Sequence, residues 1–345
     1  MEIYVLFFIT VVILLMKKKF HLTLVVLALF SGFRYNVGTD YSNYVFAFKK
    51  QNLIMFEKGF FYLNKAIYFF TNNSQIVFLI SSTIIMFFIW KAIKNYKLDP
   101  RIALFIYFTV YYIEQNFNLL RHGIAASILF YAFSNRSKKR IFFFIILASL
   151  FQKVSLVFII FLFFLNKKSS KLLMVMLIIS LIVYFTKFNI LKEINNLNFL
   201  TNGYIKYKLK VYLENRNPGS YGITFGIMLR ILMLIFIKLK VLNLKKINEQ
   251  YVTRASNIIF LGIILALLIN NSGIFIQRIL NICFMFEIVL LSYAPIKHKR
   301  KMNFIIIIIC CLFYYKIIFK MNSLETIRFT GKKFKYLPYK MKIIN

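Results

Sequence analysis

Charged and amide side chains interrupt the apolar segments of this chain at three widely separated places. The stretch FRYNVGTDYSNY contains Arg34 and Asp40, and IEQNFNLLRHGIAASI contains Glu114 and Arg121. Further on, GIFIQRILNICF contains Arg278. Guanidinium groups form bidentate hydrogen bonds with phosphate oxygens and keep their charge in an apolar environment. Several arginines that converge without metal ligands therefore indicate recognition of phosphate, and a diphosphate needs more than one of them.

Other kinds of chemistry find little support in the sequence. No GxxxxGK[ST] loop is present, so we do not expect a nucleotide bound in the P-loop manner. We also find no DxD pair and no cluster of histidine and cysteine, so we expect no metal and no cofactor. The three cysteines lie in apolar runs and are interpreted as small core residues, not as a disulfide framework.

Each candidate residue also has a purely structural interpretation. Arg34 could anchor a helix end at the membrane surface, and Asp40 could shape the turn after Gly38. Glu114 could pair with Arg121 or Arg34. For Arg121 a functional role is favoured, because it precedes the small residues HGIAA, which let helices pack closely and bury the arginine against protein.

The elements that must position these residues are membrane-spanning helices. Hydrophobic residues make up 60% of the 345, and mean hydropathy is +0.71, well above what soluble domains show. The net charge of +36 suggests nucleic-acid binding at first sight. However, the lysines cluster between the apolar runs, which is the pattern of cytoplasmic loops. The clusters are Lys17–Lys19, Lys91/Lys94/Lys97, Lys138–Arg140, Lys167–Lys168, Lys238–Lys246 and Lys297–Lys301.

Placing the lysine clusters in the cytoplasm gives an all-α polytopic protein with about 11–13 transmembrane helices. The expected spans are 2–16, 20–33, 75–90, 101–113, 117–133, 141–151, 154–165, 172–186, 222–237, 252–269, 274–293 and 304–319. The short runs 141–151 and 154–165 suggest tilted or broken helices.

Three segments of this single membrane domain (1–345) are not counted as spans. An outer loop at 34–72 is expected to carry interfacial or re-entrant helices within 45–72, because a span there would place every later basic loop outside. A long outer loop is expected at 187–221. This topology places the basic tail 320–345 on the outer face, which conflicts with the positive-inside rule. The alternative is that the tail is cytoplasmic and one span has been miscounted.

In this predicted membrane topology, nearly all the unusual polar groups lie at the outer ends of helices. Charges at membrane depth are costly and usually face a partner or a wet cavity. We therefore expect one polar cavity that opens to the outer face. It would be lined by Arg34, Arg121 and Arg278, with Asp40 and Glu114 nearby.

These motifs resemble those of a known family. FRYNVGTDYSNYVFAF resembles the R-x-x-x-G-T-D-x-x-x-Y signature of the EpsG/Wzy group of bacterial polysaccharide polymerases, and EKGF resembles its E-x-G-[FY] element. NFNLLRHGIAASILFYAF is similar to its N-x-x-R-[QH]-x-[IL]-A segment, and Arg278 lies where the group carries a late arginine. The chain departs from the group at Gln152, where a histidine is often found. Because glutamine cannot transfer a proton as histidine can, we expect hydrogen bonding to sugar or phosphate there.

The resemblance implies a GT-C-like glycosyltransferase of the bacterial cytoplasmic membrane. It would polymerise undecaprenyl-diphosphate-linked oligosaccharide repeat units at the outer face, with no nucleic acid involved. Candidate partners are the lipid bilayer, a chain-length regulator and a flippase. Arg34, Arg121 and Arg278 would bind the leaving diphosphate. Asp40 would activate the acceptor hydroxyl, with Glu114 as second candidate. The predicted supporting residues are Gly38, Tyr44, Glu57, Asn118 and Gln152.

Two other functions remain open from the sequence. A lipid-linked oligosaccharide flippase or an anion carrier would also have many helices and an arginine-lined cavity, but should carry charge along its whole path. The polar groups at the outer helix ends favour an enzyme instead. A ligase that moves finished polymer to another acceptor is hard to separate from a polymerase, although GTD and EKGF favour the polymerase.

Overall fold

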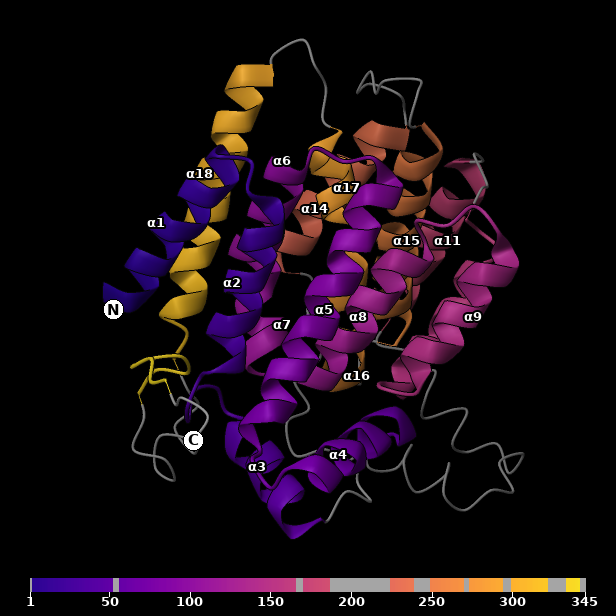
Figure 1. Ribbon diagram of the computed structural model, residues 1–345. Helices are drawn as coiled ribbons and strands as arrows, with labels where there is room; N and C mark the ends of the chain where they lie inside the picture. The colour runs from indigo at the N-terminus through magenta and orange to yellow at the C-terminus, as the bar shows by residue number, and fades with distance from the viewer. Residues whose placement is uncertain are drawn as a thin grey trace, which may run out of the picture. The chain divides into compact units, whose positions relative to one another are not determined.

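Helices form almost all of the computed structural model, and its β structure in the described residues is limited to two isolated bridges. The structure describes residues 2–51, 56–165, 170–186, 224–238, 249–269, 273–293, 299–321 and 333–341 (Figure 1). The chain divides into two compact units. Unit 1 comprises Met1–Leu156 and Ile296–Asn345, and unit 2 comprises Val157–Pro295.

Unit 1 is built around the long helix α5. Its helices are α1 (Glu2–Met16), α2 (Phe20–Gly32), α3 (Tyr41–Lys50), α4 (Lys58–Phe70), α5 (Gln75–Tyr96), α6 (Pro100–Ile106), the π-helix η1 (Tyr107–Tyr112), α7 (Ile113–Phe117), α8 (Leu120–Ala132), α9 (Lys138–Ser149) and α18 (Lys299–Ile318). Helix α5 packs against α2 and α8, and α8 packs in turn against α9. The small residues Gly123, Ala125 and Ala126 are buried, as expected for the close packing of α8.

Local sequence explains where several of these helices begin and end. Pro100 opens α6, and the Asp99 carboxylate accepts a hydrogen bond from the Arg101 backbone N–H at 2.9 Å. The predicted span 101–113 is a run of α6, η1 and α7, with the wider π-helical turn in its middle. Helices α3 and α5 end before Gln51 and Lys97, where the backbone takes a positive φ.

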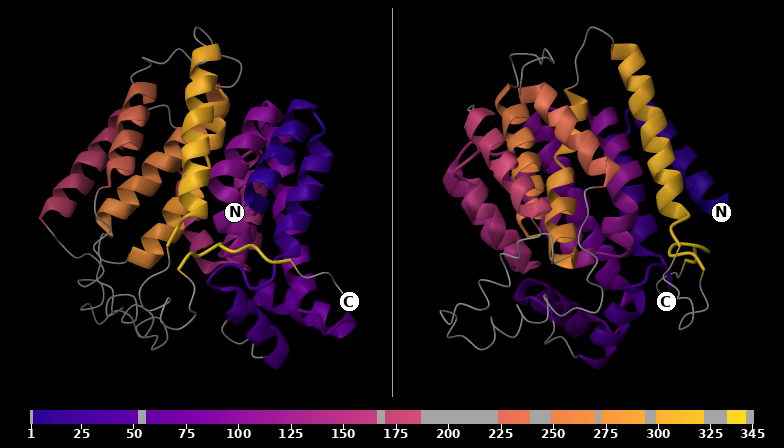
Figure 2. Two further views of the ribbon diagram at one scale, coloured as in Figure 1. Left: turned by 90° about the vertical axis from the view of Figure 1, so that its left-hand side faces the viewer. Right: turned by 180° about the vertical axis from the view of Figure 1, so that it is seen from behind.

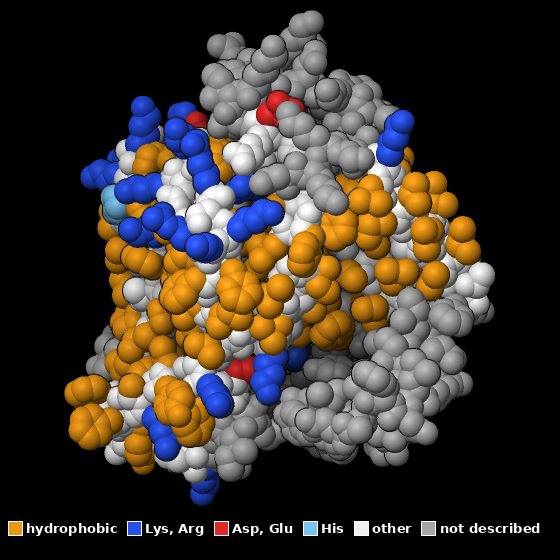
Figure 3. Space-filling model, turned by 90° about the vertical axis from the view of Figure 1, so that its right-hand side faces the viewer, with side chains coloured by type: hydrophobic (Ala, Val, Ile, Leu, Met, Phe, Trp, Pro, Cys, Tyr) orange, Lys and Arg blue, Asp and Glu red, His pale blue; other side chains and the backbone are white. Residues whose placement is uncertain are grey.

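The outer surfaces of unit 1 are apolar, as a bilayer requires. Leu6 on α1, Phe143 on α9 and Leu312 on α18 are each more than 60% exposed. Figure 3 shows a band of hydrophobic side chains, with Lys and Arg crowded on one side of it and fewer on the other. Three exposed lysine clusters of unit 1 follow α1, follow α5 and begin α9. Figure 1 shows that the end of α1, the end of α5 and the start of α9 share one end of the unit, and that α3 and α4 lie at the opposite end.

Three described helices are long and apolar enough to cross a membrane: Gln75–Tyr96, Glu249–Leu268 and Phe275–Ser292. Shorter apolar helices cover Glu2–Met16, Phe20–Gly32, Lys171–Phe185, Gly226–Ile235 and Ile307–Ile318. These helices match spans expected from the sequence, whereas the total number of spans and the GT-C-like architecture stay predictions. The expected break at 154–165 is present as a 3₁₀ turn at 153–157 followed by the short helix α10 (Phe158–Phe161).

Unit 2 is organised around α15 (Glu249–Leu268). This helix packs against α11 (Ser170–Phe185), α14 (Phe225–Lys238), α16 (Gly273–Phe284) and α17 (Glu287–Ser292). The Asn257 side-chain amide donates to the Phe164 carbonyl oxygen at 2.7 Å and ties α15 to the chain after α10. The expected outer loop 187–221 lies outside the described residues.

Candidate functional site

The GTD turn (residues 38–40) is fixed by its contacts with the end of α7. Gly38 has a φ of +91°, and a Cβ there would collide with the Phe117 carbonyl oxygen. The Asn118 side-chain oxygen accepts hydrogen bonds from the Thr39 hydroxyl at 2.7 Å and from the Asp40 backbone N–H at 3.2 Å. The turn therefore holds the half-buried Asp40 at the start of α3. The supporting roles of Gly38 and Asn118 in a functional site stay a prediction.

Replacing Gly38 with alanine should destabilise this turn strongly. A side chain at this φ is strained by about 1–3 kcal/mol, and the clash with Phe117 adds to that strain. We expect a lower melting temperature of the purified full-length protein in detergent and loss of its activity. Gly226→Ala is the control, because there the nearest atom is the flexible end of Arg230. Equal melting temperatures for the two variants would contradict the role assigned to Gly38.

Arg121 and Glu57 form an ion pair across 64 residues of sequence. Arg121 Nη1 donates to Glu57 Oε2, and the two side chains are 23% and 14% exposed. The guanidinium lies over the Phe56 ring, 4.7 Å from its centroid, and forms a hydrogen bond with Tyr44. The GTD, EKGF and NFNLLRHG motifs thus meet at one end of unit 1.

Gly59 explains the form of the EKGF motif. Its backbone N–H donates to the Leu150 carbonyl oxygen at 2.8 Å, and a Cβ at Gly59 would collide with the same residue. Glycine lets the start of α4 approach the end of α9 closely. This approach places Glu57, which directly precedes α4, within reach of Arg121.

Arg34 is fully buried, with 0% exposure. Its Nη1 donates to the Ser31 carbonyl oxygen at 2.6 Å, and its guanidinium lies 4.5 Å from the Phe78 ring and 5.2 Å from the Phe117 ring. Within the described residues, Nε and Nη2 have no hydrogen-bond partner and no carboxylate pairs with Arg34. Arg34 therefore supplies a buried positive charge beneath the site, and it is not a surface anchor.

Glu114 pairs with Lys320, not with Arg121 or Arg34. The Lys320 ammonium donates to Glu114 Oε1 at 3.0 Å. Burial raises the pKa of the Glu114 carboxyl, but the charges of Lys320, Lys335 and His122 outweigh it, so the pKa lies below its usual range. A carboxylate held ionised in this way is a weak base.

The segment 333–341 returns to the end of α2 and completes this part of unit 1, as Figure 2 shows in yellow. The Tyr4 hydroxyl donates to the Tyr336 carbonyl oxygen at 2.8 Å, and the Tyr339 hydroxyl donates to the Phe30 carbonyl oxygen at 2.6 Å. This part of the predicted tail therefore lies beside the GTD turn. Which face of the membrane it occupies stays a prediction.

Lys335 is a candidate site residue that the sequence interpretation missed. Its carbonyl oxygen accepts a hydrogen bond from the Gly38 backbone N–H at 3.3 Å. Burial and the neighbouring Lys320 lower the pKa of the Lys335 ammonium, while Glu114 and Asp40 act in the opposite direction. Lys335 thus shares its electrostatic environment with both candidate bases. A lysine flanked by aromatic residues in FKYLPYK was the available signal.

Two further residues predicted for the site are Gln152 and Arg278. Gln152 is buried between α9 and the following 3₁₀ turn, where its carbonyl oxygen accepts from the Ser155 backbone N–H at 3.0 Å. Arg278 is half-buried on α16 of unit 2. Its convergence with Arg34 and Arg121 stays a prediction.

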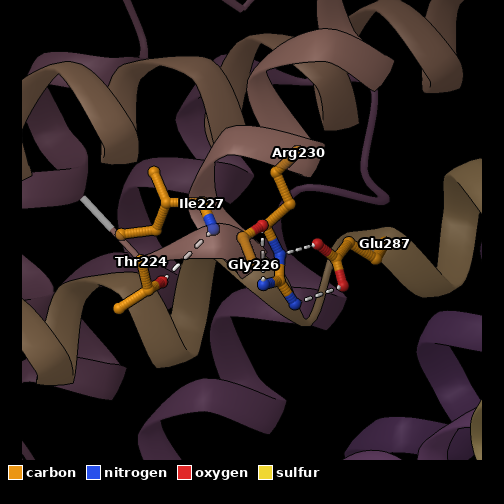
Figure 4. Close-up of polar contacts among 5 residues, drawn as sticks. All are labelled: Thr224, Gly226, Ile227, Arg230 and Glu287. Carbon is orange, nitrogen blue, oxygen red and sulfur yellow. Dashed lines mark hydrogen bonds and ion pairs between the residues drawn. The ribbon is translucent and has the colours of Figure 1, made fainter.

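Arg230 of unit 2 is engaged by a carboxylate (Figure 4). Its Nε and Nη2 donate to the two oxygens of Glu287, the second at 3.1 Å, and its guanidinium lies 4.0 Å from the Phe284 ring centroid. At the start of α14, the Thr224 hydroxyl oxygen accepts from the Ile227 backbone N–H at 3.3 Å. This bidentate ion pair joins α14 to α17, so a structural role explains why an arginine is present at position 230.

Comparison with known proteins agrees with the motifs. The EpsG family model matches residues 17–341. None of the curated proteins and none of the solved structures matches the chain. The matched range includes the GTD turn, the Arg121–Glu57 pair and the segment 333–341. The chain therefore belongs to the EpsG family.

Proposed function

We propose that this chain is a membrane glycosyltransferase that polymerises undecaprenyl-diphosphate-linked oligosaccharide repeat units at the outer face of the bacterial cytoplasmic membrane. Family membership and the apolar helices indicate a membrane protein of polysaccharide biosynthesis. The observation that carries the finer proposal is the meeting of Arg121 with the GTD turn. Tyr44 connects the two, because it forms a hydrogen bond with Arg121 and the charge of Asp40 acts on its hydroxyl group.

The reaction makes two demands that these residues can meet. The bond between the anomeric carbon and the diphosphate oxygen breaks, and a bond to the acceptor hydroxyl oxygen forms. Negative charge then builds on the leaving diphosphate, and Arg121 is the cation placed to stabilise it, with Arg278 as a second candidate. The proton of the acceptor hydroxyl goes to Asp40.

The other charged residues are assigned supporting roles. Arg34 raises the positive electrostatic potential at the site, because its guanidinium is buried and its charge is weakly screened. Glu57 orients Arg121 through their ion pair. Glu114 is the weaker candidate base, because Lys320 holds it ionised. Lys335 places a further ammonium group beside both carboxylates.

A deletion strain complemented with the wild-type gene tests this function. Surface glycans and lipid-linked glycans are separated on gels. We expect a polymer ladder with the gene and single repeat units, displayed outside, without it. Single units trapped on the cytoplasmic side would indicate a flippase. Finished polymer left on its lipid would indicate a ligase. An unchanged ladder in the deletion would refute a role in polymerisation.

A further inference from the structure

A cavity of about 820 Å³ lies within unit 1, beside the chain that leads into the GTD turn. Its walls come from residues 35–36, from α3 and from the loop 71–75 that leads into α5. None of the predicted site residues lines it. Its volume falls within the range of about 300–1,000 Å³ that small-molecule sites occupy.

The cavity wall combines exposed aromatic rings with amides and hydroxyls. Tyr35 is 42% exposed and Phe46 is 60% exposed. Asn36, Asn72 and Asn73 bring amide groups, which both donate and accept hydrogen bonds. Sugar rings present apolar C–H faces and many hydroxyls, so they need this combination of a flat apolar surface and adaptable polar groups.

Hydrogen bonds of Gln75 hold the floor of the cavity to the backbone around Arg34. The Gln75 side-chain amide donates to the carbonyl oxygens of Gly32 and Arg34, the second at 2.9 Å. The Tyr41 hydroxyl donates to the same side chain at 3.3 Å. Gln75 itself is 1% exposed. The wall is therefore held in place before any ligand binds, which lowers the cost of binding.

We propose that this cavity is a carbohydrate subsite that holds sugar residues of the glycan while its reacting end lies at the GTD turn. Tyr35 and Phe46 stack on sugar rings, and the asparagine amides bond to sugar hydroxyls. Lys49 on the rim adds a positive charge that favours an acidic sugar. The inference rests on the proposed function, because the ligand is the glycan of that substrate.

Direct binding tests the subsite without requiring catalysis. The full-length protein in lipid nanodiscs is titrated with oligosaccharides released by mild acid from the polymer of the wild-type strain. We expect Tyr35→Ala to weaken binding about tenfold, which corresponds to about 1.4 kcal/mol. Tyr62→Ala is the matched control, since Tyr62 is 64% exposed on α4 and does not line the cavity. Equal affinities for the two variants would overturn the subsite.

Two further pairs protect the test against misfolding of one variant. Asn72→Ala is compared with Asn43→Ala, and Lys49→Ala with Lys50→Ala; the first member of each pair lines the cavity and the second does not. We expect weaker binding only for Asn72→Ala and, with acidic oligosaccharides, Lys49→Ala. Unchanged binding for both cavity variants would also overturn the proposal.

The polymer ladder separates failure of the subsite from failure of the proposed function. Loss of a sugar-holding site should shorten the chains, because the enzyme releases its glycan sooner, while linkage of two units continues. Tyr35→Ala should therefore give a shorter ladder. A ladder of wild-type length would count against the subsite alone, whereas a ladder that persists in the gene deletion would count against the polymerase.

Discussion

Arg121→Ala is expected to abolish the polymer ladder and leave single repeat units. Removing one preorganised positive group from a leaving diphosphate should lower the rate by about 10²–10³-fold. Arg121→Lys should recover part of the activity, since lysine keeps the charge but lacks the planar fork that meets Glu57 and phosphate together. The measurement is the ladder from complemented deletion cells, normalised to the amount of folded protein from size-exclusion chromatography.

Two controls separate chemistry from folding in this experiment. Arg101→Ala removes a charge whose side chain is 53% exposed and bonded to Asp99, and it should leave the ladder intact. Arg121→Ala also leaves the Glu57 carboxylate without its partner, which is destabilising in a half-buried position. Adding Glu57→Gln relieves that cost. If the double variant regained the ladder, Arg121 would be a structural residue and the proposed diphosphate contact would be refuted.

Asp40→Asn is expected to eliminate polymerisation with little change in stability. Asparagine has nearly the same shape, and the hydrogen bond from the backbone of residue 40 to Asn118 does not involve the carboxylate. Loss of a general base typically costs about 10²–10⁴-fold in rate. The ladder and the melting temperature of the purified protein are measured together. Asp99→Asn, at the start of α6, serves as the matched control.

Glu114→Gln distinguishes the two candidate bases. Because Lys320 holds Glu114 ionised, we expect this variant to retain most of the ladder. A normal ladder for Asp40→Asn together with none for Glu114→Gln would reverse the assignment. Normal ladders for both would mean that the GTD turn serves the fold alone.

The sequence predicted the parts of unit 1 that depend on local patterns. Apolar runs located α1, α2 and α5, because hydropathy and charge act within one segment. The lengths of α1 and α2 match closely, whereas α5 continues to Tyr96, beyond the expected end at 90. Helix α4, which covers the stretch 59–70, is not among the apolar helices found in the described residues, and its exclusion as a span stays a prediction. The glycine before Thr39 was assigned to a tight turn, and its φ of +91° confirms that.

Contacts between distant segments could not be predicted in the same way. Nothing near Glu57 in the sequence shows that its partner is Arg121, because a long helix and several turns must first be placed. The pairing of Glu114 with Lys320 spans 206 residues, and the sequence interpretation named two arginines instead. The carbohydrate subsite escaped notice for a related reason: its asparagines and tyrosines are ordinary loop residues until α3 and the loop 71–75 come together.

The return of segment 333–341 has a consequence for the order in which the protein matures. Tyr4 and Tyr336, joined by a hydrogen bond, are 332 residues apart, so this end of unit 1 has a very high contact order. Helices α1 to α9 can enter the membrane while later residues are still on the ribosome. The GTD turn then lacks the backbone carbonyl of Lys335, and Asp40 and Glu114 lack its ammonium group. In a nascent chain that already spans the bilayer, the proposed site is therefore still incomplete, and we expect activity only after synthesis has passed this segment.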